Sequence, residues 1–166
     1  MSRPTLRPYL PDDAEALATL FRVSIDVLAE DDYSDAQRAA WAAAADDVDE
    51  FGTWVSGMLT LVVDSETGPV GFASLEDNSA IALLYVRPDF ARQGVATLLC
   101  DAMEQLAAAR GTTKISTDAS ETSQTFFARR GYTPVRRNSV VSNDEWLANT
   151  TMEKAIGTAG TGDFKS

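Results

Sequence analysis

The chain has 166 residues, of which 45% are hydrophobic and 23% are charged, which is typical of one globular domain. Its net charge of −11 disfavours nucleic-acid binding, because phosphates would be repelled, and its single cysteine excludes an internal disulfide or a cysteine-rich metal site. The absence of histidine removes the usual zinc ligands and the usual general base, so we expect no metal.

The acidity would attract a cationic partner, or it serves only to keep the protein soluble. No apolar run reaches the roughly 20 residues that cross a bilayer, and the first residues do not resemble a signal peptide. We therefore expect a cytoplasmic protein that does not bind membranes.

Several helices are predicted in the first third of the chain, after one short strand at residues 6–10. A proline followed by acidic residues marks a helix start, and apolar side chains then repeat at helical spacing over residues 17–28. A second helix contains Gln37 and Trp41. A third helical segment is predicted over residues 51–58, although its two glycines weaken it.

The middle of the chain predicts three strands, a helix and a fourth strand. Residues 59–63 and 70–75 predict a hairpin, and the nearly continuous apolar run at residues 80–86 predicts a central strand that is buried on both faces. A helix with one apolar face spans residues 95–106. The strand at residues 114–117 then returns parallel to the central strand.

The last part of the chain predicts one more helix at residues 123–130 and two closing strands at residues 132–141 and 146–152. We expect a single mixed α/β domain over residues 1–154, followed by a disordered tail at residues 155–166. Cys100 lies in an apolar helical stretch, where a small core side chain is the preferred interpretation.

A phosphate-binding turn is the main functional candidate, at the point where the central strand leads into the next helix. The main-chain N–H groups at a helix start are unpaired and favour an anion. Gly94 and Ala96 are small enough for phosphate oxygens to approach the main chain, and Arg92 supplies positive charge. An ordinary strand-to-helix turn is the alternative for such a short motif.

The segment from Leu84 to Leu99 resembles the acetyl-CoA signature of the GNAT acetyltransferase superfamily. Gly94 and Ala96 match the signature, whereas Ala91 stands where the family has Gln or Arg, and Arg92 supplies the charge next to it. The opening at residues 6–9 and the aromatic-to-Gly-aromatic segment at residues 126–132 are also similar to the family.

This resemblance implies a GNAT fold, which is a mostly antiparallel central sheet with a splayed parallel strand pair and helices on both faces. It implies acetyl-CoA as cosubstrate, a primary amine of a small molecule or peptide as acceptor, and a possible homodimer. The residues implied in cofactor binding are Leu84, Tyr85, Val86, Arg92, Gln93, Gly94, Val95, Ala96, Thr97 and Phe127.

The transfer itself requires a proton acceptor, because an amine that attacks an acetyl thioester directly must lose a proton. Glu76 follows a strand and is one candidate, with a solvated turn carboxylate as the alternative. Asp118 is the other, because the carboxyl ends of strands border ligand crevices in open α/β sheets. The alternative for Asp118 is a cap of the next helix.

The resemblance also implies a tyrosine that protonates the departing thiolate, but Phe127 stands at that position. Tyr85, Tyr132 or water would then take this role, or catalysis is weak; Tyr132 is alternatively a packing residue of the sheet. A catalytically weak or inactive acyl-CoA-binding or sensing module is therefore the rival function.

The acceptor pocket is expected near Tyr33, Gln37 and Trp41, in the region that shapes this pocket in the superfamily. Aromatic faces of this kind hold cationic amines, whereas a core position is the alternative for Trp41. A nucleotide-binding or purely structural domain has less support, because the Gly-rich signatures of such domains are missing.

Overall fold

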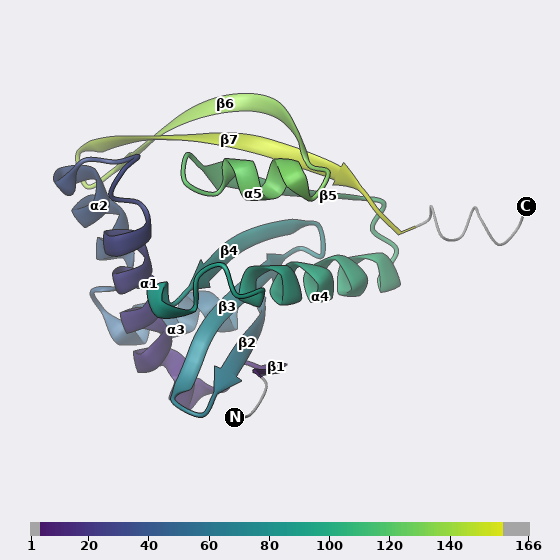
Figure 1. The fold of residues 1–166 in the computed structure, drawn as a ribbon, viewed down its shortest axis with the longest axis horizontal. Coiled ribbons are helices and arrows are strands. Elements are labelled where there is room, and N and C mark those ends of the chain that lie inside the picture. Colours follow the sequence, from purple (N-terminus) through teal and green to yellow (C-terminus); the bar gives the residue numbers. More distant parts are fainter. Residues whose placement is uncertain (1–3, 158–166) are drawn as a thin grey trace, which may run out of the picture.

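The computed structural model describes residues 4–157, in which one short strand is followed by helices and then by the other strands of the same sheet, with further helices between them (Figure 1). The helices of more than one turn are α1 (Ala14–Leu28), α2 (Asp35–Ala42), α3 (Val48–Ser56), α4 (Val95–Ala109) and α5 (Gln124–Arg129). The strands are β1 (Thr5–Pro8), β2 (Leu59–Ser65), β3 (Gly68–Glu76), β4 (Ala80–Val86), β5 (Lys114–Ser120), β6 (Thr133–Ser142) and β7 (Glu145–Ala155).

The seven strands of the described chain form one sheet in the order β1-β2-β3-β4-β5-β7-β6. Neighbouring strands in this part of the chain run antiparallel, with β4 and β5 as the one parallel pair. The crossover from β4 to β5 passes through α4, as parallel neighbours require. The predicted mixed α/β fold with a mostly antiparallel sheet is therefore confirmed.

The parallel pairing of β4 with β5 is short, and as a result the sheet divides into two parts. β4 and β5 are in register only at Ala80 with Ser116 and at Ile81 with Thr117, where the Thr117 hydroxyl donates to the Ile81 carbonyl at 2.8 Å. Beyond this point β5 turns away from the rest of β4 together with β7 and β6 (Figure 1). The sheet is consequently split into two parts that diverge toward the end of β4.

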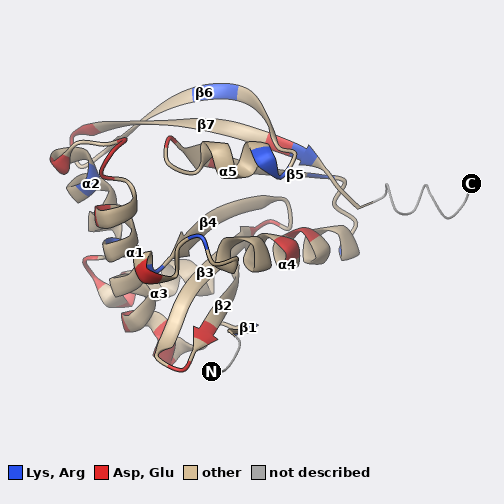
Figure 2. Cartoon of the chain, in the orientation of Figure 1, with Lys and Arg blue, Asp and Glu red and all other residues tan. Residues whose placement is uncertain are grey.

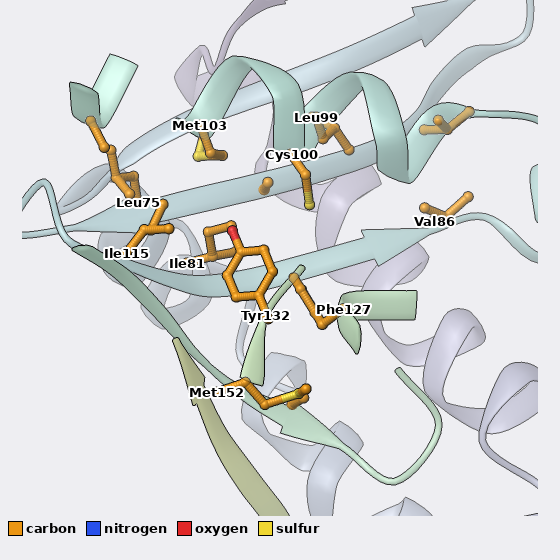
Figure 3. Packing of buried hydrophobic residues seen from close by; sticks show 14 of the residues in the cluster. Leu75, Ile81, Val86, Leu99, Cys100, Met103, Ile115, Phe127, Tyr132 and Met152 are labelled. Carbon is orange, nitrogen blue, oxygen red and sulfur yellow. The ribbon is translucent and has the colours of Figure 1, made fainter. Parts of the chain in front are cut away.

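Helices cover both faces of the sheet, each with its own apolar core. α4 packs against β3 and β4, and its side chains join those of β5 and α5 in the core drawn in Figure 3. α1 and α3 pack on the other face around Phe21, Phe51 and Phe72. Cys100 is fully buried in the first core, which raises the pKa of its thiol to about 12 and agrees with a packing role.

Some element bounds differ from those expected from the sequence. α3 begins at Val48, because Asp47 caps it by accepting from the Glu50 N–H at 3.1 Å. The chain also remains folded past residue 154: Ile156 is buried, and its N–H donates to the Thr113 carbonyl at 2.9 Å. The remainder of the predicted tail, residues 158–166, lies outside the described residues. None of the described helices is long and apolar enough to cross a bilayer.

Candidate active site

A cavity of about 470 Å³ opens where β4 and β5 diverge. Its walls come from α1, the end of β4, the start of α4, the end of β5 and α5. Because the parallel pairing ends at Ile81, Leu84 and Val86 line the cavity from a stretch of β4 that has no strand partner on the β5 side. An extended ligand can therefore lie along this edge of β4.

The loop that leads into α4 has an unusual backbone. Arg92 has φ 64° and Gly94 has φ 86°, so two left-handed residues stand close together just before the helix. Alternation of this kind turns successive N–H groups toward one point and creates an anion-binding concavity. Gly94 is the N-cap of α4, and a Cβ added there would meet nothing within 4 Å, so there is open space beside the main chain.

The first turn of α4 continues this anion-binding surface. Ala96 and Thr97 line the cavity, whereas the Val95 side chain is buried in the core and has only its main chain to offer a ligand. Arg92 is exposed and lines the cavity. Figure 2 shows basic residues in this loop, in a molecule whose charged residues are mostly acidic. A phosphate here would meet a helix N-terminus and a guanidinium together.

Internal bonds hold the loop in shape. The Arg87 guanidinium donates to Asp89 at 2.7 Å, which holds the pKa of that carboxyl below its usual range, and it lies 4.9 Å from the centre of the Phe90 ring. The Gln93 side chain donates to the Asp89 carbonyl at 3.0 Å and does not line the cavity. Gln93 is among the residues implied in cofactor binding, but its side chain stabilises the loop and does not face the cavity.

Tyr85 and Trp41 meet in the wall on the α1 side. The Trp41 indole N–H donates to the Tyr85 hydroxyl at 3.2 Å, and both residues line the cavity. Burial raises the pKa of Tyr85, so its hydroxyl keeps its proton at neutral pH. Because the oxygen accepts the bond from Trp41, the hydroxyl hydrogen is left to be donated to a ligand.

Tyr33 and Gln37, the other residues expected to contact the acceptor, hold α2 against β7 and do not line the cavity. The Tyr33 hydroxyl donates to the Ala148 carbonyl at 2.6 Å, and Gln37 donates to the Trp146 carbonyl at 2.8 Å. The prediction of direct contact is therefore not met by this geometry. Tyr33 supports the cavity indirectly, through its edge-on contact with Trp41 at 5.2 Å between ring centres and through the bond that its hydroxyl accepts from the Glu121 N–H at 2.9 Å.

The two candidate carboxylates lie in different places. Asp118, on β5, lines the cavity and accepts a hydrogen bond from the Thr151 hydroxyl at 2.6 Å. Glu76 is exposed at the last position of β3, opposite Ala80 at the beginning of β4, and does not line the cavity. The expectation that Glu76 reaches the cleft is not met, because the cleft opens toward the other end of β4.

Tyr132 is also outside the cavity. It is buried, its hydroxyl donates to Glu104 at 2.8 Å, and its ring lies edge-on to Phe127 at 5.1 Å between centres (Figure 3). The structure thus agrees with the packing alternative for Tyr132. Phe127 itself is buried and lines the cavity, so it offers an apolar wall at the position of the expected tyrosine.

One wall of the cavity was missed by the sequence reasoning. It consists of Ser24, Ile25 and Leu28 from the second half of α1 and of Ala29, the C-cap of this helix. Helical spacing indicated that this face of α1 is buried, but it could not show that the last turns face a cavity. Ser24, a polar residue among the apolar residues of that face, was the one sequence feature that could have indicated a cavity there.

Comparisons with known proteins show which proteins this chain is similar to. A family model described as acetyltransferase (GNAT) domain matches residues 29–156. The uncharacterized N-acetyltransferase YafP of Escherichia coli (strain K12) is 28% identical over 152 residues, which cover 92% of this chain and 96% of that protein. A GCN5-related N-acetyltransferase structure from Rhodopseudomonas palustris is 51% identical, with a TM-score of 0.91 and coverage of 94% of this chain and 98% of that one.

A more distant structure shares the fold alone. The PaiA N-acetyltransferase of Thermoplasma acidophilum, in complex with coenzyme A, is 15% identical, with a TM-score of 0.74. The likeness covers 93% of this chain and 99% of that one. The two proteins therefore share the fold, and coenzyme A is bound in that protein's structure.

Proposed function

Because the chain belongs to the GNAT family of acetyltransferases, we propose that it transfers the acetyl group of acetyl-CoA to a primary amine of a small molecule or a peptide. The observation that carries this proposal is the meeting of two features in one cavity. One is the left-handed loop at Arg92 and Gly94, and the other is the unpaired edge of β4. Together they suit a ligand with a pyrophosphate at one end and an extended arm.

Acetyl-CoA is proposed to lie with its pyrophosphate on the N–H groups of the first turn of α4, next to Arg92. Its pantetheine arm follows the free edge of β4 at Leu84 and Val86 toward the point where the strands diverge. Phe127 packs against this arm from α5. The thioester then comes to rest between β4 and β5, near Tyr85 and Asp118.

The chemistry follows from these neighbours. The neutral amine attacks the thioester carbonyl, the C–N bond forms and the C–S bond breaks, and Asp118 accepts the proton that the nitrogen loses. Tyr85 donates a hydrogen bond to the carbonyl oxygen, on which negative charge develops. Its raised pKa makes it a poor proton donor for the thiolate. Water therefore protonates the departing thiolate, which accounts for Phe127 at the position of the usual tyrosine.

The acceptor is proposed to enter beside α1, where Ile25, Leu28 and Trp41 line the cavity. These side chains would contact the apolar body of the amine, while the Asp118 carboxylate attracts the incoming ammonium, which loses one proton to water before the neutral amine attacks.

Phe127 also favours a rival, a module that binds acyl-CoA without turnover. Release of thiol from acetyl-CoA, measured with purified protein over a panel of amines, separates the two functions. Turnover with at least one amine supports the enzyme. Tight binding of acetyl-CoA without acetylation of any amine identifies the binding module, and preference for ATP or NAD in calorimetry would contradict both.

The cofactor site is tested with Gly94→Glu, which puts a carboxylate beside the proposed pyrophosphate. We expect the Kd for acetyl-CoA to rise roughly 100-fold or more, because charge-assisted bonds are replaced by repulsion. Gly111→Glu is the matched control: Gly111 also has a positive φ, of 91°, and open space around its Cα, but it follows the far end of α4. Equal losses in both variants would contradict the proposed site.

A further inference from the structure

A row of polar side chains crosses β5, β7 and β6 on the face of the sheet that carries Asp118. Asp118 lies directly opposite Thr151 in the pairing of β5 with β7, and Thr151 lies opposite Arg136 in the pairing of β7 with β6. The next pair on this face is Asn138 with Asn149. The register of three strands therefore connects the exposed edge strand β6, through Thr151, to Asp118, which lines the cavity.

Hydrogen bonds connect these polar side chains, and the donors point from β6 through β7 toward Asp118 on β5. The Arg136 Nε donates to Asn138 Oδ1 at 2.9 Å, which identifies the other end of that amide as the donor. Asn138 Nδ2 then donates to Thr151 Oγ1 at 2.9 Å, and Arg136 Nη2 donates to the same oxygen at 3.2 Å. Asn138 Nδ2 is also bonded to Asn149 Oδ1 at 2.8 Å.

The two bonds that Thr151 accepts decide what its hydroxyl does. A threonine hydroxyl has one hydrogen and two acceptor sites, and guanidinium and amide N–H groups can only donate. Both acceptor sites are thus taken by Asn138 and Arg136, and the hydrogen is directed to Asp118 Oδ1 at 2.6 Å. Thr151 is buried, so water does not compete easily for this bond.

We propose that Thr151 is a positioning residue for Asp118, and that Asn138 and Arg136 orient Thr151 for this task. The inference rests on the proposed role of Asp118 as proton acceptor. Asp118 is exposed, and an exposed carboxylate samples several rotamers unless a neighbour holds it. The bond from Thr151 engages Oδ1, so Oδ2 is the oxygen that receives the amine proton. A fixed carboxylate saves the cost of ordering it in each catalytic cycle.

Thr151→Val tests the inference, because it removes the hydroxyl and nearly preserves the shape. We expect kcat to fall roughly 10- to 100-fold, the range that a misplaced catalytic group causes, while the KM for acetyl-CoA changes less than about twofold. Thr151→Ser keeps the hydroxyl and should restore most of kcat. Asn138→Ala should give a smaller loss of kcat, and it keeps the inference testable should the valine variant not fold.

Thr150→Val is the matched control, since Thr150 is the neighbouring buried threonine of β7 and lies opposite Ala119 instead of Asp118. It should keep wild-type kcat, and the Tm of every variant is measured alongside. Wild-type kcat in Thr151→Val, or a serine variant as slow as the valine variant, would overturn the inference. Turnover that is lost in Asp118→Asn but retained in Thr151→Val would overturn this inference alone. Turnover that survives Asp118→Asn would overturn both it and the role of Asp118.

Discussion

Tyr85 and Tyr132 both lie in apolar surroundings that raise the pKa of their hydroxyl groups. The two tyrosines differ in the group to which each hydroxyl can donate its hydrogen. Tyr132 gives its hydrogen to Glu104 within the core, whereas Tyr85 accepts from Trp41 and lines the cavity. A hydroxyl that remains protonated and faces a ligand can stabilise developing negative charge, so only Tyr85 is suited to a catalytic contact.

We therefore expect Tyr85→Phe to lower kcat roughly 100-fold, as the loss of one preorganised donor does in other enzymes. Tyr132→Phe should leave kcat nearly unchanged but lower the free energy of unfolding by about 1–2 kcal/mol, because Glu104 loses a buried partner. Steady-state kinetics and urea unfolding of both variants check this. A similar loss of kcat in the two variants would contradict the assignment of Tyr85.

The contact between β3 and α4 sets the position of the proposed cofactor loop, which leads into α4. A Cβ added at Gly71, on β3, would come within 2.6 Å of Val95 Cγ1 and 3.3 Å of Leu99 Cδ1. Val95 is the first residue of α4 and directly follows Gly94. The glycine on the strand thus allows the helix start to lie close to the sheet, with its N–H groups facing the cavity.

Gly71→Ala is expected to push the first turn of α4 away from the sheet. The overpacking should cost about 1–3 kcal/mol of stability and should weaken acetyl-CoA binding, because the loop and helix start move together. Gly57→Ala is the control, since Gly57 has a negative φ of −76° and its added Cβ would make only ordinary contacts. Calorimetry with acetyl-CoA and thermal unfolding measure the two effects; unchanged binding in Gly71→Ala would contradict this role.

Local elements could be predicted from the sequence, because their patterns repeat within a few residues. The phosphate-binding role of Gly94 and Ala96 was inferred from a local pattern of the same kind, and it stays a prediction. The position of Glu76 outside the cavity could not be predicted, because the hairpin pattern does not show at which end of β4 the strands β4 and β5 diverge. Tyr33 and Gln37 were assigned to the acceptor pocket from the region that shapes it in the superfamily. Their hydrogen-bond partners on β7 are more than 100 residues away, so the local pattern could not show this packing role. The bond from Thr151 to Asp118 depends on strand register, which residue periodicity alone does not determine.

At the scale of the whole molecule, the two parts of the sheet are joined by a short parallel pairing and by contacts on both sides of the cavity. At one end, near the β6–β7 turn, Gln37 of α2 and Tyr33 in the turn before it are bonded to β7 (Figure 1). At the other end α4, which packs on β3 and β4, is bonded to the second part of the sheet through Glu104. The width of the cavity should therefore depend on these two connections.

Glu104 is the centre of the second connection: it accepts from Tyr132, and its carboxylate lies 3.1 Å from Arg130 Nη2 and 3.0 Å from Lys154 Nζ. Only 13% of the Glu104 side chain is exposed, and removing its charge leaves Lys154 without this carboxylate and Arg130 with Asp101, 2.9 Å away, as its remaining ion-pair partner. Loss of one partner from a fully buried ion pair costs about 3–5 kcal/mol, and the partial exposure of Lys154 reduces this to an expected cost of about 2 kcal/mol for Glu104→Gln.

The matched control for that variant is Glu153→Gln, on β7, because Glu153 pairs with Lys114 at 3.6 Å and that lysine is 64% exposed. An exposed pair contributes at most about 1 kcal/mol, so the control should unfold at nearly the wild-type urea concentration. If Glu104 also maintains the distance between the two parts of the sheet, Glu104→Gln should raise the KM for acetyl-CoA, and the control should not. Equal stability of the two variants would show that α4 is held to β7 by packing of the core and not by this ion pair.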